Sequence, residues 1–251
     1  MSTRRGGVSA PPFDSLNLGA ALPCAAGSDG VTAVAENRRR VAAALGARPV
    51  WLRQVHGADV VRLTPDLAAD SAPIPCADAS VSTEPGLACA VLVADCLPLL
   101  MCSPDGRAVA AAHAGWRGLA AGVAERTLAL LCEAGGCAPG DVRVWLGACI
   151  GPAHFEVGAD VLMAFDSVPG AFDQACFVYR PRPDGQARWL ADLPALARRR
   201  LQRAGVTRIS GGHWCTVTDR SRFFSFRRDG RIGSVGAGVT GRMVAAIAIV
   251  D

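Results

Sequence analysis

Residues 87–102, LACAVLVADCLPLLMC, together with RAVAAAH at residues 107–113, form the most apolar part of the chain and decide its fold. Residues 88–94 are a continuous apolar run of strand length, which is typical of a sheet covered on both faces. We interpret residues 107–113 as the hairpin partner of this strand across the turn SPDG at residues 103–106. The longest apolar run contains an aspartate and a proline, so it indicates a buried strand and its turn, not a membrane span.

The patterns on both sides of this centre predict an α+β fold. Residues 31–46 carry apolar side chains on one helical face and end at a glycine, which predicts a helix. Further helices are expected at residues 118–134, 157–166 and 191–204, and further strands at residues 142–147, 206–210 and 244–250. Residues 48–54 are a short apolar stretch that breaks at QVHG. Strands and helices mix without strict βαβ alternation, which favours α+β over a doubly wound fold. Since no repeat or low-complexity linker divides residues 1–251, we expect one domain.

The composition excludes several classes of function. The 51% hydrophobic and 19% charged content of the 251 residues is that of an ordinary globular protein. The net charge of +4 is too small to predict a nucleic acid as the partner. All 26 basic residues are arginine, and the absence of lysine excludes Schiff-base catalysis on lysine and a Walker A phosphate loop. Any anion site must therefore use arginine, backbone N–H groups or a metal.

Histidine and cysteine limit the kind of metal or redox site. The sequence has four histidines, His56, His113, His154 and His213, so it can supply one small metal site at most. Its ten cysteines form no CxxC pair, and MSTRRGGVSAPP at the start lacks the apolar stretch of a secretory signal. We therefore expect reduced thiols in a cytoplasmic protein without a membrane segment.

Three short strings each place a reactive side chain where an apolar strand ends beside glycine or proline. They are QVHG with His56, ADCLP with Cys96 and HAGWRG with His113. Sites are often built where a rigid strand passes into a loop. The other two histidines have no comparable setting, and we expect them in core or surface roles.

Three interpretations of this Cys/His/His set remain open. In the first, the Cys96 thiolate and both imidazoles bind zinc and leave the fourth position open, as in a catalytic zinc site. In the second, Cys96 is a nucleophile, His113 is its base, and His56 or Asp95 orients the base. The third is a buried thiol with two unrelated, hydrogen-bonded histidines.

The arginines offer candidate anion ligands. The HAGWRG string precedes a predicted helix, whose N-terminus favours anions, and Arg117 in this string could bind a phosphate or carboxylate. Equally, Trp116 could pack in the core while Arg117 caps a neighbouring carbonyl. We interpret the arginine runs at residues 38–40 and 198–200 as solvated helix faces, with Arg38 as the exception.

Strings spread over nearly the whole chain occur together in a recognisable order. They are GGVS at 6–9, SLNLG at 15–19, ENR at 36–38, QVHG at 54–57, ADCLPLLM at 94–101, HAGWRG at 113–118, IGPAHFEVG at 150–158 and FFSFRRDG at 223–230. With these strings the chain resembles the YfiH family, which was first labelled multicopper polyphenol oxidase (laccase) and later assigned purine nucleoside phosphorylase activity. One departure is Ala153, where many members of the family have cysteine.

The resemblance implies a fold, a metal site and an activity. The fold would be a single α+β domain of layered mixed β-sheets flanked by helices, similar to the catalytic domain of cytotoxic necrotising factor. The family's metal-binding residues fall on His56, Cys96 and His113. The family's activities are phosphorolysis of adenosine, inosine, guanosine and methylthioadenosine, and deamination of adenosine, so the expected partners are a purine nucleoside and phosphate. Glycine N–H groups would hold the phosphate together with the candidate residues Arg117, Arg4, Asn37 and Arg38.

The laccase label and a second activity can be weighed on the same residues. Copper(II) prefers imidazole-rich sites, and four histidines are too few for a multicopper centre, although one copper could bind the Cys/His/His set. Some relatives are described as peptidoglycan-editing factors that remove misincorporated L-serine from a cell-wall precursor. An amidase with Cys96 as nucleophile is therefore the alternative function, and chelation would separate it from a zinc mechanism. A non-enzymatic binding module is disfavoured, because the sequence shows no charged tail, exposed amphipathic helix or Pro-rich motif.

Overall fold

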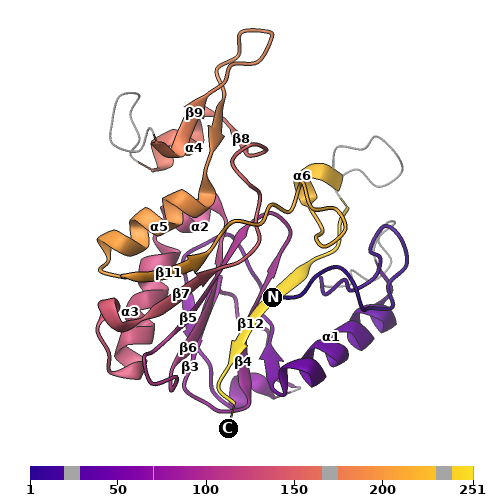
Figure 1. The fold of residues 1–251 in the computed structure, drawn as a ribbon. Helices are drawn as coiled ribbons and strands as arrows, with labels where there is room; N and C mark the ends of the chain where they lie inside the picture. Colours follow the sequence, from indigo (N-terminus) through magenta and orange to yellow (C-terminus); the bar gives the residue numbers. More distant parts are fainter. Residues whose placement is uncertain (20–28, 70, 166–174, 230–238, 251) are drawn as a thin grey trace.

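Strand β6 (Val109–Ala114) is buried along its whole length and lies inside a six-stranded mixed sheet. The computed structural model describes residues 1–19, 29–69, 71–165, 175–229 and 239–250, and it orders this sheet β11-β7-β5-β6-β3-β2 (Figure 1). β6 pairs antiparallel with β5 and β3, whereas β2 with β3 and β7 with β11 are parallel. The other strands are β2 (Val60–Arg62), β3 (Ala79–Ser82), β5 (Leu97–Cys102), β7 (Arg143–Leu146) and β11 (Arg208–Gly211).

A second sheet packs against the first. It has the order β1-β4-β12 and consists of β1 (Arg48–Val50), β4 (Leu87–Val93) and β12 (Met243–Ala248). Side chains alternate between the two faces of a strand. In β6, Val109 and Ala111 pack with Cys89 and Val91 of β4 between the sheets. The intervening alanines of β6 face the opposite way, into the larger core beneath the helices.

Helices cover the outer faces of both sheets. α3 (Val123–Gly135) and α5 (Leu193–Arg203) pack on the six-stranded sheet, and α1 (Val31–Leu45) packs on the three-stranded one (Figure 1). The short helix α2 (Trp116–Ala120) precedes α3. The layers are therefore helix, sheet, sheet, helix, which confirms the expected α+β architecture.

Smaller elements lie at one end of these layers. β8 (Glu156–Val157), β9 (Phe177–Tyr179) and β10 (Trp189–Ala191) form a small antiparallel sheet at the top of Figure 1, beside α4 (Ala159–Ala164). The remaining elements are α6 (Phe226–Asp229) and the 3-10 turns η1 (Asp66–Ala68) and η2 (Pro139–Asp141). Residue 166 of the predicted helix 157–166 and Gly230 of the FFSFRRDG string lie outside the described residues. Among the described residues, none of the helices is long and apolar enough to cross a membrane.

The structure corrects the predicted hairpin. The partner of β6 is β5, with Leu97 opposite Ala114 and Cys102 opposite Val109, and residues 88–94 belong to the other sheet. The apolar run from 87 to 102 is therefore two strands in two sheets, not one strand and its turn. The chain changes sheet at Asp95, whose φ of 96° lies in the left-handed region. Continuous hydrophobicity on both sides concealed this break.

Two further predictions are wrong in detail. The helix expected at 118–134 begins at Trp116 and is divided at Gly122, whose φ is 92°. The arginine run at 198–200 is not a solvated face, because Arg198 donates to the carbonyl oxygens of Ile209 and Gly211 and Arg200 pairs with Glu125. α5 lies between α3 and β11, so its arginines meet partners on both sides. In the run at 38–40, by contrast, Arg39 and Arg40 are exposed.

Candidate active site

His56, Cys96 and His113 lie together, although each comes from a different part of the chain. His113 is at the end of β6, Cys96 is between β4 and β5, and His56 is in the loop between β1 and β2. Their possible ligand atoms all lie within 4.8 Å of one another. Cys96 Sγ is 3.8 Å from His56 Nε2, and the two imidazole rings meet edge to face with centroids 4.8 Å apart. The structure thus brings the three predicted residues into one cluster.

A buried carboxylate, Asp78, orients two members of this cluster. Its Oδ1 lies 2.8 Å from His113 Nδ1 and accepts the backbone N–H of His56 at 2.9 Å. Its Oδ2 accepts the N–H groups of Gly57 at 2.7 Å and Val55 at 3.0 Å. Because Nδ1 of His113 faces the carboxylate, Nε2 is the nitrogen left for a ligand. A carboxylate behind a histidine is the usual support of a metal-binding imidazole.

Asp78 was not predicted from the sequence. Its position just before the buried strand β3 was the available signal, but that strand is four residues of small side chains and was not predicted. Asp78 also binds His113 through its backbone, because its carbonyl oxygen accepts the N–H of His113 at 2.7 Å. One residue therefore holds both the loop that carries His56 and the end of β6.

Among the described residues, Asp95 hydrogen-bonds to other segments of the chain and not to the cluster. Its Oδ1 accepts from Thr216 Oγ1 at 2.5 Å and its Oδ2 from the backbone N–H of Arg227 at 2.6 Å. Its carbonyl accepts the N–H of Ile150 at 2.9 Å. These bonds fix the loop that carries Cys96 to three residues from distant parts of the chain, Ile150, Thr216 and Arg227. In the nucleophile interpretation, the carboxylate that contacts His113 is thus Asp78 and not Asp95.

The charges of the cluster favour a thiolate. Burial raises the pKa of Cys96, but the charge and hydrogen bond of His113, followed by those of His56, outweigh burial and bring the pKa to about 6. Burial lowers the pKa of His113, but the Cys96 thiolate and the Asp78 carboxylate raise it to about 9. At neutral pH the metal-free cluster is therefore a thiolate beside an imidazolium. A thiolate is the form that binds a metal or attacks an electrophile.

The residues fit a single metal ion. One thiolate and two imidazoles are ligands that zinc and copper accept, and three protein ligands leave a fourth position open. A glycine keeps the space clear, because a Cβ at Gly115 would lie 3.1 Å from both Cys96 Sγ and His56 Cδ2. A Cβ at Gly118 would lie 2.6 Å from the carbonyl oxygen of Gly57. Position 118 therefore also needs glycine, so that the HAGWRG string can pack against the loop that carries His56.

The four predicted phosphate ligands lie in different surroundings. Arg117 is exposed, with its guanidinium carbon 4.4 Å from the centroid of the Trp116 ring. Arg4 pairs with Asp14 at 3.1 Å, and Arg38 donates to the carbonyl oxygen of Leu18. Asn37 is completely buried and donates to Ser9, Ser15 and Asn17. Within the described residues, no hydrogen bond joins any of the four to the cluster.

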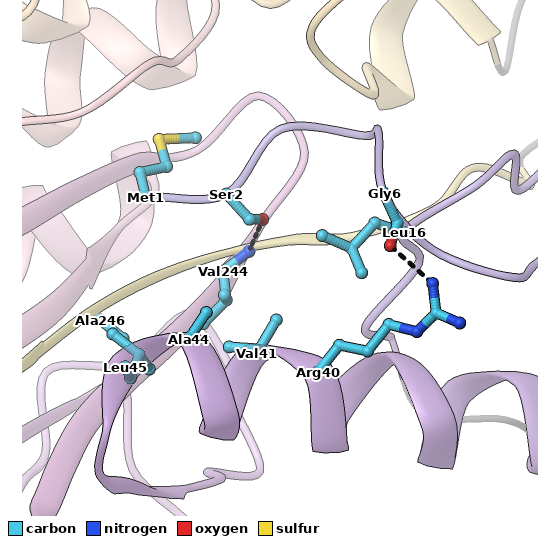
Figure 2. A pocket seen from close by; sticks show the side chains of 10 residues that line it. All are labelled: Met1, Ser2, Gly6, Leu16, Arg40, Val41, Ala44, Leu45, Val244 and Ala246. Carbon is cyan, nitrogen blue, oxygen red and sulfur yellow. Dashed lines mark hydrogen bonds between the residues drawn. The ribbon is translucent and has the colours of Figure 1, made fainter.

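An apolar cavity of about 320 Å³ lies elsewhere, between the N-terminal segment, α1 and β12 (Figure 2). Two hydrogen bonds border it, from Arg40 Nη1 to the carbonyl oxygen of Gly6 and from the N–H of Val244 to Ser2 Oγ, both at 3.0 Å. Its lining residues are Met1, Ser2, Gly6, Leu16, Arg40, Val41, Ala44, Leu45, Val244 and Ala246. The cluster of His56, Cys96 and His113 is not part of this lining.

Comparisons with known proteins agree over almost the full length. A family model described as multi-copper polyphenol oxidoreductase laccase matches residues 1–250. The chain is 47% identical over 234 residues to "Purine nucleoside phosphorylase YfiH" of Escherichia coli, covering 92% of this chain and 88% of that one. It is 49% identical over 234 residues to a protein named purine nucleoside phosphorylase from Pseudomonas aeruginosa, covering 93% and 88%.

Solved structures share the fold. A Neisseria meningitidis protein superposes with a TM-score of 0.83 at 41% identity and covers 99% of this chain and 92% of that one. YlmD from Geobacillus stearothermophilus gives a TM-score of 0.82 at 34% identity, with 99% and 90% covered.

Proposed function

The chain belongs to the multi-copper polyphenol oxidoreductase laccase family, together with the YfiH proteins, and we propose that it is a purine nucleoside phosphorylase. The observation that carries the proposal is the cluster of His56, Cys96 and His113, with Asp78 behind it. The names of relatives at 47% and 49% identity supply the reaction class. We assign the substrates to purine nucleosides and phosphate, with adenosine deamination as a second reaction at the same site.

The proposed metal is one zinc ion. Cys96 Sγ, His56 Nε2 and His113 Nε2 would hold it, and Asp78 would keep His113 in the required tautomer. A bound zinc ion supplies Lewis acidity and lowers the pKa of a bound water. The site does not fit a multicopper centre. Two of the four histidines form the cluster, while His213 is exposed and stacks on Trp214 and His154 is half-buried on another segment.

In phosphorolysis, the protein must bring an anion next to a positive charge that develops on the sugar. A phosphate oxygen bonds to C1′, the bond from C1′ to the purine nitrogen breaks, and the purine leaves with that electron pair and takes up a proton. With no lysine in the chain, arginine and backbone N–H groups are the available phosphate ligands. We propose Arg117 near the start of α2 for this role, and we keep Arg4, Asn37 and Arg38 as further candidates.

The second candidate function is amide hydrolysis with Cys96 as nucleophile. The arrangement of Cys96, His113 and Asp78 supports it, because a thiolate, an imidazole and an orienting carboxylate are the parts of a thiol hydrolase. The substrate would be a cell-wall precursor that carries a misincorporated L-serine. A nucleophilic mechanism survives removal of metal, whereas the zinc mechanism does not.

The test is the rate of hypoxanthine release from inosine as the phosphate concentration is varied. The phosphorylase predicts a rate that saturates with phosphate and is lost after thorough chelation. A rate that does not depend on phosphate would reject the phosphorylase. Full activity towards a serine-containing muropeptide precursor in the chelated protein would instead support the amidase.

A further inference from the structure

Arg242, directly before β12, lies next to the loop that carries Cys96. The following residue, Met243, pairs with Val93 at the end of β4. Continuing this antiparallel register places Arg242 opposite Ala94, two residues before Cys96. In Figure 1, β12 runs through the middle of the molecule alongside β4. Topology thus brings a cation from the end of the chain to the cluster.

The guanidinium of Arg242 is oriented by two carbonyl oxygens but forms no ion pair with a described residue. Its Nη1 donates to the carbonyl oxygens of Thr240 at 3.0 Å and Gly241 at 3.3 Å. Within the part of the chain that the structure describes, no carboxylate lies within ion-pair distance of it, whereas Arg4 is paired with Asp14. Nε and Nη2 likewise have no partner among the described residues. These two atoms form the edge of a guanidinium that binds an oxyanion through two parallel hydrogen bonds.

The backbone of Arg242 is fixed by the N-terminal segment. Its N–H donates to Asn17 Oδ1 at 2.8 Å, and its carbonyl accepts the N–H of Leu18 at 3.0 Å. Asn37 donates in turn to the carbonyl oxygen of Asn17 at 2.9 Å. A Cβ at Gly19 would come within 3.1 Å of Arg242 Cγ, so the aliphatic stem is also closely packed. A rigid cation of this kind binds an anion without a large loss of side-chain entropy.

The guanidinium of Arg242 lies near the residues of the Cys96 loop. Burial lowers the pKa of Arg242, and the negative charges of Cys96 and Asp95 partly oppose this effect, so both groups are near enough to act on it. The half-exposed ring of Phe226 has its centroid 6.0 Å from the guanidinium carbon. Phe226 directly precedes Arg227, whose N–H binds Asp95. The guanidinium of Arg242 therefore lies at the same end of the molecule as the cluster.

We propose that Arg242 binds the phosphate that the reaction consumes, through Nε and Nη2. The inference rests on the proposed phosphorylase function. It also gives Asn37 an indirect role, because the hydrogen bonds of Asn37 hold the segment that positions Arg242. Arg117, which is exposed on α2, then makes the smaller contribution to phosphate binding.

The test compares Arg242→Gln and Arg242→Lys with the wild type and with a control, Arg107→Gln. Arg107 has a side chain that is 86% exposed, on the turn at the far end of the β5–β6 hairpin. The rate of hypoxanthine release from inosine is measured against phosphate. We expect Arg242→Gln to raise the KM for phosphate by about tenfold to hundredfold, the usual effect of losing a charge-assisted contact. The KM for inosine should change much less, Arg242→Lys should recover part of the loss, and Arg107→Gln should match the wild type.

A second readout is calorimetric titration of inorganic phosphate into the same proteins, with circular dichroism as the check on folding. Weaker phosphate binding by a folded Arg242→Gln supports the inference. If this variant does not fold, Arg242→Met, which keeps the packed stem, replaces it. A wild type that saturates with phosphate beside a variant with unchanged KM and affinity for phosphate overturns the inference alone. A wild type that neither needs nor binds phosphate overturns the proposed function and the inference together.

Discussion

Asp78→Asn is the sharpest perturbation of the site, because it changes one buried atom and keeps the volume. Asp78 is completely buried, and its carboxylate accepts four hydrogen bonds, two on each oxygen. Three come from backbone N–H groups and one from the His113 ring. Asparagine replaces one of these oxygens by an NH₂ group, which only donates. If NH₂ replaces Oδ1, it faces His113 and the N–H of His56. If it replaces Oδ2, it faces the N–H groups of Val55 and Gly57.

The magnitude follows from this count. In either orientation two donors lose their acceptor. The bond from His113 is buried, whereas those from residues 55–57 are partly buried. An unpaired group costs about 1–3 kcal/mol when buried and less where water reaches it, so we expect a loss of stability of at most about 6 kcal/mol. For a protein of this size, each kcal/mol lowers Tm by about 2–4 °C. Loss of a group that hydrogen-bonds a metal-binding histidine also typically weakens metal affinity by about 10–100-fold. The variant should therefore melt at lower temperature and release its metal more easily.

The assay has two parts and a matched control. Thermal unfolding gives Tm, and a competition titration with a chromophoric chelator gives zinc affinity. The control is Asp59→Asn, a neighbouring aspartate whose side chain is 77% exposed and which should leave both values unchanged. If Asp78→Asn binds zinc like the wild type and unfolds at the same temperature, the assignment of Asp78 as the support of His113 is refuted.

Three other predictions concern the cluster and its anion. Protein purified without added metal should contain about one zinc per chain, with a Zn–S distance of about 2.3 Å. Cys96→Ser should lose this zinc in elemental analysis and should also lose turnover. Equal zinc content in the variant would reject Cys96 as a ligand. Cys102→Ser is the control and should keep both. In the chelated protein, the rate of Cys96 alkylation should rise with pH around a midpoint of about 6, because the thiolate is the reactive form; a midpoint near 9 would contradict the thiolate–imidazolium pair. Arg117→Ala should raise the KM for phosphate in inosine cleavage but leave ammonia release from adenosine unchanged, and an equal fall in both activities of a folded protein would assign Arg117 to the architecture of the site.

The cluster could be predicted from the sequence because each of its members stands at a recognisable boundary. Cys96 lies two residues before Pro98, His113 lies two residues before Gly115, and His56 directly precedes Gly57. Such boundaries are local signals. Their meeting in space is not local, and the family resemblance supplied what spacing could not.

The features that could not be predicted from the sequence depend on contacts between distant segments. Asp78 supports His113 only because β3 pairs with β6, and β3 is too short and too rich in small residues to be recognised. Arg242 reaches the Cys96 loop through the pairing of β12 with β4. The predicted hairpin was wrong for the same reason, because hydrophobicity alone does not show that the chain changes sheet at Asp95.

The most direct test of the proposed activity is to identify the sugar product. Wild-type protein is incubated with inosine and inorganic phosphate, and the mixture is followed by phosphorus NMR. The phosphorylase predicts ribose 1-phosphate in the same amount as hypoxanthine, and no such signal with Cys96→Ser. Free ribose in place of ribose 1-phosphate, or equal product from wild type and Cys96→Ser, would contradict it.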